Sequence, residues 1–176
     1  MDRDPEALDL SDLGGHRPDL ALVAVARHVE FEADADEVWA LLDQADELAD
    51  WLGFEVVDDA TRPGAGLAVG DAFGLAAPDG TVHHVLVTAA EGPRRLAWHW
   101  WREGGEVSTV EITVEPADGA HQRVRVVETL ALAASGQGGL ARSQLAAAED
   151  ELGSWSPRLD RLGLRLARRL GVAACR

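Results

Sequence analysis

Glu128 is the residue whose type and position most clearly suggest chemistry. It lies within residues 124–130, where apolar and polar residues alternate. Successive strand side chains point to opposite faces, so Glu128 falls on the apolar face. The residues sharing that face are Val124, Val126, Leu130 and Leu132. A carboxylate there needs a donor or a proton, which makes Glu128 a candidate ligand anchor or general acid. Two alternatives stay open: a bulge that turns it outward, or a neighbouring arginine that pairs with it.

Three of the six tryptophans fall within residues 98–101. Alternation predicts that Trp98 and Trp100 share one face of a strand, and that His99 and Trp101 share the other. Two indoles on one face suit the wall of a hollow that an apolar molecule can enter. Plain core packing is an equally good interpretation of either Trp98 or Trp100 taken alone.

His83 and His84 are adjacent on a predicted strand, so one faces inward and the other outward. Neither has a second ligand at a spacing typical of a metal site. The sequence contains no nucleophile-elbow motif, and its glycine-rich pieces lack the lysine and helix of a phosphate loop. We therefore expect no metal and no organic cofactor.

The composition narrows the class of protein. The chain has 176 residues, 47% of them hydrophobic, which fits one folded domain. The formal net charge of −15 argues against nucleic acid as the main partner, because an acidic surface repels phosphates. The single cysteine, Cys175, fits a reducing cytoplasm, and no apolar run is long enough to span a membrane. Arginines concentrate in residues 158–176. We interpret them as a solvated helix face that leans toward the acidic rest of the domain, with contact to an acidic partner as the alternative.

The elements that must position these residues follow from periodicity and turn signals. We expect a mostly mobile arm over residues 1–20 and one domain over residues 21–172. A strand over 22–31 precedes two short helices, the first capped by Asp34 and Glu37 and the second ending at Gly53. Six further strands are predicted over 54–59, 66–75, 81–90, 94–102, 106–115 and 122–133. A flexible link over 135–144 leads to an amphipathic helix that starts at 156 or 157, because Pro157 suits a first helical position.

This order predicts an α+β, helix-grip architecture. A seven-stranded antiparallel sheet with one dry face needs a cover, and the final helix is the only long amphipathic element. If the sheet curves around that helix, the two short helices close one end and a cavity is left between sheet and helix.

Several ordered motifs resemble the START-like, Bet v 1-like SRPBCC superfamily, and within it bacterial relatives of the Hsp90 ATPase activator. The resemblance covers about residues 22–170 and depends on order and spacing, since no single motif is diagnostic. The matching segments are residues 28–33, 36–42 ("EVWxxL"), 48–53 ("hxxWLG"), 62–64 with 70–71, 93–100 ("PPrrLxxtW") and 108–112, and the helix of Trp155, Leu159 and Leu162. The resemblance implies the helix-grip fold and a pocket for a lipid or another small molecule.

Three functions follow as hypotheses, since this fold hosts many activities. The first is binding of a small hydrophobic or aromatic molecule in the cavity. On this hypothesis the protein binds its ligand and does not catalyse a reaction. The second is a polyketide cyclase- or aromatase-like reaction, in which Glu128 and His83 or His84 position the substrate. The third, implied by resemblance alone, is a chaperone-regulator interaction; a homodimer is a further option. The residues predicted to contact a ligand are Trp98, Trp100, Glu128, Trp39, Trp51, His84, Leu159 and Leu162.

Overall fold

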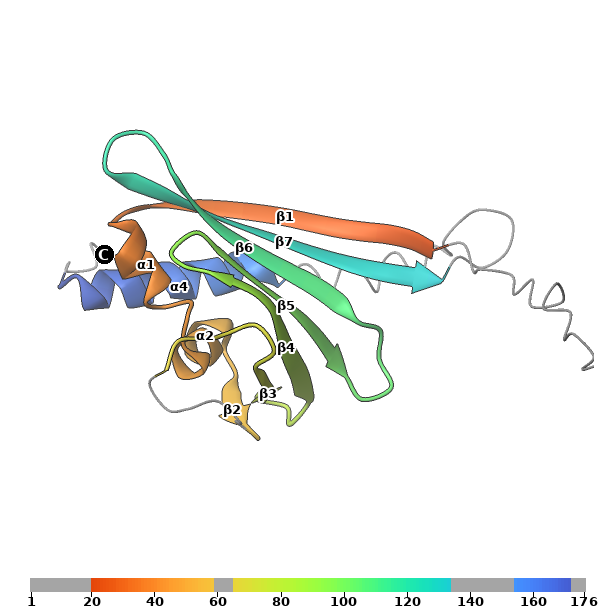
Figure 1. Cartoon of the computed structure of the whole chain (residues 1–176). Helices are drawn as coiled ribbons and strands as arrows, with labels where there is room; N and C mark the ends of the chain where they lie inside the picture. The colour runs from red at the N-terminus through yellow and green to blue at the C-terminus, as the bar shows by residue number, and fades with distance from the viewer. Residues whose placement is uncertain (1–19, 59–64, 134–153, 172–176) are drawn as a thin grey trace, which may run out of the picture.

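The computed structural model describes residues 20–58, 65–133 and 154–171. Within them, seven strands form one antiparallel sheet in the order β1-β7-β6-β5-β4-β3-β2 (Figure 1). The strands are β1 (Leu20–Glu32), β2 (Glu55–Val57), β3 (Ala72–Ala76), β4 (Val82–Glu91), β5 (Arg95–Arg102), β6 (Ser108–Pro116) and β7 (His121–Ala133). The helices are α1 (Ala35–Trp39), α2 (Ala45–Leu52) and α4 (Trp155–Arg169). The predicted helix-grip fold, a curved sheet around a C-terminal helix, is confirmed.

The sheet has one buried and one more open face, as alternation requires. On β7, Val124 and Val126 are buried, whereas Arg123 and Arg125 are exposed. The buried face packs against α4, whose apolar stripe is Trp155, Leu159, Leu162 and Leu166. The long pair β1 and β7 extends beyond the start of α4, as Figure 1 shows. The core therefore lies between the concave face of the sheet and α4.

Local sequence signals set the two short helices. The Glu37 carboxylate accepts a hydrogen bond from the Asp34 backbone N–H at 2.9 Å, as expected for the start of α1. Gly53 ends α2 with φ of 85°, the left-handed conformation that glycine adopts without a steric cost. The Trp51 indole N–H donates to the Leu41 carbonyl at 2.9 Å and so ties α2 to the segment that follows α1.

Arg161 joins α2 to α4. Its guanidinium donates to the carbonyl oxygens of Trp51 at 2.9 Å and of Leu52 at 2.7 Å. These are carbonyls of the last turn of α2, which have no partner within the helix. Arg165, one turn later on α4, pairs with Glu47 at 3.3 Å and with Asp50. The end of α2, and with it the start of β2, is held against α4.

Several predicted boundaries were wrong. The strand predicted over 54–59 covers only Glu55–Val57, and the one predicted over 106–115 begins at Ser108. Two further differences have a clear physical cause. Residues 66–71 are not part of a strand, because the Asp71 carboxylate accepts from the Ala68 N–H at 2.8 Å and closes a turn. The last helix begins at Trp155, one residue before the predicted start, so Pro157 occupies its third position. Proline is tolerated there because N–H groups of the first turn have no intrahelical partner.

Some predictions fall outside the described residues: the arm over 1–20 apart from Leu20, the turn at 62–64, the link over 135–144 and Cys175. Among the described residues, no helix is both long and apolar enough to cross a membrane.

Candidate functional site

Glu128 is fully buried on the concave face of the sheet, with 0% of its surface exposed. The prediction that it shares a face with Val124 and Val126 is confirmed, and no bulge turns it outward. Its Oε1 accepts hydrogen bonds from Trp100 Nε1 at 2.8 Å and from Ser108 Oγ at 2.7 Å. Its Oε2 accepts one from Trp155 Nε1 at 2.6 Å. Three uncharged donors therefore satisfy the buried carboxylate.

The three donors come from three different elements. Trp100 is on β5, and Ser108 opposes it at the start of β6. Trp155 is the first residue of α4, so its bond to Glu128 crosses from helix to sheet. Because every donor reaches inward from its own element, the carboxylate fixes the start of α4 over β5, β6 and β7.

Indole rings surround the carboxylate. Trp98 and Trp100 pack edge-to-face with ring centroids 6.4 Å apart, and Trp100 lies 6.1 Å from Trp155. Trp51 of α2 adds a fourth ring, 6.4 Å from Trp155. These separations lie within the range of favourable aromatic pairs. We call Trp51, Trp98, Trp100 and Trp155 the indole cluster.

Arg158, on the first turn of α4, lies against this cluster. Its guanidinium carbon is 5.1 Å from the ring centroids of Trp100 and Trp155, and 5.4 Å from that of Phe54. Burial lowers the pKa of Arg158 to about 10, and Glu128 opposes that change. The group therefore stays charged at neutral pH. Its Nη1 is buried and has no hydrogen-bond partner among the described residues, and the same holds for Nε1 of Trp98.

His83, not His84, is the histidine that faces the core. Its ring lies 5.1 Å from Trp100 and 5.3 Å from Phe54. Burial, with smaller contributions from Arg102 and Arg158, lowers the pKa of His83 to about 4. His83 is therefore neutral at pH 7 and can donate from one ring nitrogen and accept at the other.

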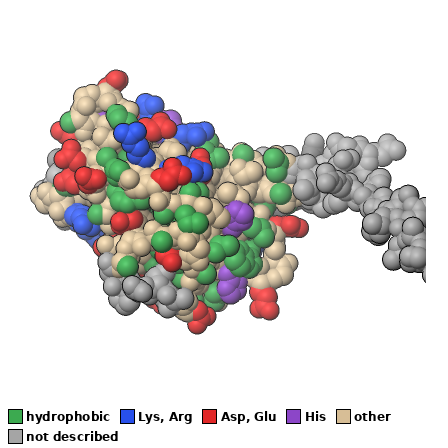
Figure 2. All heavy atoms as spheres, in the orientation of Figure 1, with side chains coloured by type: hydrophobic (Ala, Val, Ile, Leu, Met, Phe, Trp, Pro, Cys, Tyr) green, Lys and Arg blue, Asp and Glu red, His purple; other side chains and the backbone are tan. Residues whose placement is uncertain are grey.

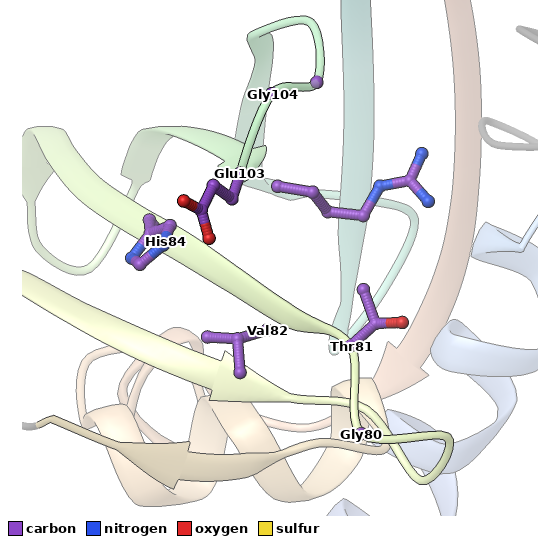
Figure 3. Close-up of a pocket in the computed structure, with 8 residues that line it drawn as sticks. Gly80, Thr81, Val82, His84, Glu103 and Gly104 are labelled. Carbon is purple, nitrogen blue, oxygen red and sulfur yellow. The ribbon is translucent and has the colours of Figure 1, made fainter.

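His84 lies on the outer face of the sheet, 5.6 Å from the ring of Trp101. With Glu103 and Gly104 it lines a surface cavity of about 490 Å³ between the β3–β4 and β5–β6 turns (Figure 3). In Figure 2, the histidine side chains on the right, toward the grey segment, lie among hydrophobic ones, with acidic side chains nearby. His84, predicted as a ligand contact, is thus placed apart from Trp98, Trp100 and Glu128.

The other predicted residues divide between the cluster and its rim. Trp51, Leu159 and Leu162 are buried in the same core as Trp98 and Trp100. Trp39 is half-buried and packs against this core from α1, close to Gly92. The structure thus brings six of the eight predicted residues together and leaves Trp39 at the edge and His84 outside.

The open hollow expected beside Trp98 and Trp100 is closed in this structure. Trp98 is 0% and Trp100 5% exposed, so no water-sized space of any extent adjoins them. The physical reason is that Trp155, Arg158 and Phe54 pack against the two indoles. A ligand that reaches Trp100 must therefore displace at least one of these side chains.

Phe54 lies between the buried cluster and a surface cleft. Its ring is 6.1 Å from Trp100, and it also lines a cavity of about 530 Å³. The other lining residues are Asp50, Gly53 and Glu55 near the end of α2, and Ala76, Ala77, Pro78 and Gly80 around the β3–β4 turn. This volume is in the usual range for small-molecule sites. Phe54 is half-buried and follows Gly53, so it is the side chain best placed to open a route inward.

Sequence reasoning missed the contacts of Arg158 with Trp100 and Trp155. All arginines after residue 157 were interpreted as a solvated face, yet Arg158 lies three residues after Trp155, on the same face of α4. That spacing was the available signal. For His83, the signal was its parity with Val85 and Val87, which are both buried. No group of three His, Cys, Asp or Glu side chains that could hold a metal ion occurs in the described part of the chain.

Several solved structures are similar in fold to this chain. MLL2253 from Mesorhizobium loti has a TM-score of 0.62 at 20% identity, covering 84% of this chain and 98% of its own. CalU16 from Micromonospora echinospora has a TM-score of 0.56 at 20% identity, with 86% and 88% covered. DynU16, from the dynemicin biosynthetic locus, has a TM-score of 0.58 at 22% identity and 81% of this chain covered. The chain spans about half of DynU16, 46% of its length. At these identities the likeness shows the fold.

No curated protein matches the sequence significantly. Residues 23–162 match the family described as polyketide cyclase / dehydrase and lipid transport. This agrees with the predicted superfamily, and the match spans more than half of the 176 residues. The chain therefore belongs to the polyketide cyclase / dehydrase and lipid transport family.

Proposed function

We propose that this protein binds a small hydrophobic or aromatic molecule between the concave face of its sheet and α4, against Trp98, Trp100 and Trp155. The family description supports this, because cyclisation, dehydration and lipid transport all require a small, largely apolar molecule to be enclosed. The ligand is bound without a metal or organic cofactor, in a protein of the cytoplasm. Trp51, Leu159 and Leu162 complete the apolar surroundings.

One observation supports this proposal most strongly: a polar N–H group without an acceptor lies buried within the aromatic cluster. A core serving packing alone avoids buried donors that lack acceptors, since each costs about 1–3 kcal/mol. Here the Nε1–H of Trp98 is such a donor, deep on the concave face. An acceptor atom on a bound molecule would satisfy it and would recover that free energy.

The closed state of the cluster requires that binding be coupled to a side-chain movement. Phe54 touches Trp100 on one side and the 530 Å³ cleft on the other. Rotation of its ring would join cleft and cluster without moving a strand. Rotamer changes of this kind are common on binding.

A fluorescence titration tests the proposal. Fatty acids, sterols and aromatic polyketides are added to wild type, Trp100→Phe and Trp101→Phe, and indole emission and thermal shift are recorded. At least one ligand is expected to change the emission of wild type and of Trp101→Phe. Trp101 lies on the outer face and is the matched control. The change should be much smaller in Trp100→Phe. Absence of any emission change and any thermal shift across the set would refute the proposal.

A cyclase-like enzyme is the second candidate, favoured by one contact pattern. His83 packs against one part of the Trp100 indole, while Glu128 accepts its N–H. Two ionisable groups thus contact the same indole ring, and a polyketide bound against that ring would lie near both, as acid–base chemistry requires. DynU16 belongs to a biosynthetic locus, which agrees with a pathway intermediate as ligand. On this hypothesis Glu128→Gln abolishes turnover while ligand binding persists; unchanged turnover would exclude Glu128 as a catalytic group.

The narrower relationship to Hsp90 activators, and with it a chaperone-regulator role, stays a prediction. A pull-down from lysate that yields a stoichiometric chaperone would support it, and the absence of any such partner would count against it. A homodimer also stays a prediction, and light scattering of the purified protein measures it directly.

A further inference from the structure

Arg158 is a half-buried cation, and one nitrogen of its guanidinium has no hydrogen-bond partner among the described residues. Its Nη1 is buried without an acceptor among the described residues. The rings of Phe54, Trp100 and Trp155 face the guanidinium at 5.1 to 5.4 Å and offset part of the cost of burying its charge. Ring faces do not replace the acceptor that a buried N–H needs. An oxygen acceptor can therefore reach Nη1 only if a neighbouring side chain such as Phe54 moves, and it would then satisfy this N–H group.

Glu128 does not supply that oxygen. Its two carboxylate oxygens already accept hydrogen bonds from Trp100, Ser108 and Trp155 at 2.6 to 2.8 Å. Its negative charge stabilises the Arg158 cation at longer range, without a direct bond to Nη1. None of the described residues supplies the acceptor that Nη1 lacks.

We propose that Arg158 binds the carboxylate of an aromatic acid whose ring packs against Phe54, Trp100 and Trp155. This inference rests on the proposed function and assigns the ligand's chemical class. A guanidinium suits this role because its planar fork of N–H groups matches a carboxylate and stays charged at neutral pH. The same three rings that now face Arg158 offer an apolar, aromatic surface to the rest of the ligand.

The cleft beside Phe54 provides the route. Its volume of about 530 Å³ accommodates a bicyclic aromatic acid, and Phe54 is common to the cleft and to the Arg158 surroundings. Two carboxylates, Asp50 and Glu55, line this cleft. Pairing with Arg165 reduces the repulsion that an anionic ligand meets from Asp50, whereas Glu55 opposes its entry. Arg161 holds the carbonyls of Trp51 and Leu52, so a rotating Phe54 ring would move against a fixed backbone.

The test compares an acid with its neutral analogue. Binding of 2-naphthoate and of 2-naphthamide is measured by calorimetry on wild type, Arg158→Gln and Arg168→Gln. Arg168 is exposed in the last turn of α4, so its variant carries the same charge change away from the cluster. Wild type and Arg168→Gln are expected to bind the acid at least about tenfold more tightly than the amide, the effect of one charge-assisted hydrogen bond. In Arg158→Gln this preference should disappear.

The affinity for the acid is divided by the affinity for the amide within each variant. A general loss of stability lowers both affinities and therefore leaves this ratio unchanged. If Arg158→Gln does not fold, as judged by circular dichroism, Arg158→Lys replaces it and should show a smaller preference than wild type. Equal binding of acid and amide by wild type overturns the inference while leaving the proposed function intact. A preference for the acid that survives in Arg158→Gln also overturns the inference. If neither probe binds and no ligand of the fluorescence set does, both proposals fail.

Discussion

Glu128 of β7 and Trp155 of α4 are joined by a hydrogen bond of 2.6 Å that crosses from the sheet to the helix it encloses. Both residues are fully or almost fully buried. The bond explains why a carboxylate is tolerated in the core: its surroundings are built from donors. It also gives the carboxylate a structural role that exists whether or not a ligand is bound.

Replacing Glu128 should therefore reduce stability in proportion to the donors left unsatisfied. Glu128→Leu removes the acceptor of Trp100, Ser108 and Trp155, and we expect a loss of at least about 3 kcal/mol in the free energy of unfolding. Glu128→Gln keeps one oxygen and should lose about 1–3 kcal/mol. Urea unfolding followed by circular dichroism measures both. A Glu128→Leu variant as stable as wild type would contradict this account.

Arg161→Gln should loosen α2 from α4. The guanidinium satisfies two carbonyls of the last turn of α2, and hydrogen bonds from charged groups each contribute about 1.5–3 kcal/mol. Because Arg161 is only partly buried, we expect a total loss near the lower value. Arg168→Gln, on the exposed face of the same helix, serves as the control and should change the urea midpoint little. Equal midpoints for the two variants would show that the Arg161 bonds do not stabilise the fold.

His83 should make stability fall as the pH is lowered. Its pKa is about 4 in the folded chain and near 6.5 when unfolded, because burial disfavours the imidazolium. Between these values the unfolded chain binds the proton and the folded chain does not, so the contribution present above pH 6.5 is lost as the pH falls toward 4. Arg102 and Arg158 act in the same direction, and Asp79 opposes them.

The measurement compares wild type, His83→Phe and His84→Phe in urea at pH 7 and pH 5. Wild type and His84→Phe should lose more stability on acidification than His83→Phe. The same loss in all three proteins would show that His83 does not titrate as described.

Two glycines should respond oppositely to alanine. A Cβ on Gly74 would lie 2.9 Å from the Val57 backbone oxygen, which cannot move without disrupting the β2–β3 pair, so Gly74→Ala should cost about 1–3 kcal/mol. A Cβ on Gly163 would meet the Phe31 ring at 2.9 Å. That ring borders a surface cavity into which it can turn, and alanine is about 1 kcal/mol better in a helix interior. Gly163→Ala should thus be neutral or stabilising; thermal unfolding of both variants tests the contrast.

The parts of the fold governed by strict periodicity could be predicted from the sequence. Alternation placed Trp98, Trp100 and Glu128 on the concave face, and the leucine spacing of residues 159–166 identified the covering helix. The β3 start could not be predicted, since Asp71 forms a turn through a side-chain bond that apolar patterning does not reveal. The closed state of the cluster could not be predicted either, because it depends on how Arg158 and Phe54 pack over Trp100. Side-chain packing between elements distant in sequence leaves no periodic signal.

The most direct test of a ligand site on the concave face is the two-dimensional ¹H–¹⁵N spectrum of the six indole N–H groups. Each resonance is assigned by a Trp→Phe variant, and the protein is titrated with the ligand that gives the largest fluorescence change. The signals of Trp98, Trp100 and Trp155 are expected to shift, with Trp98 changing most because its N–H gains an acceptor. Trp101, on the outer face, should not shift. Shifts confined to Trp101, with the three inner indoles unchanged, would contradict a ligand site on the concave face.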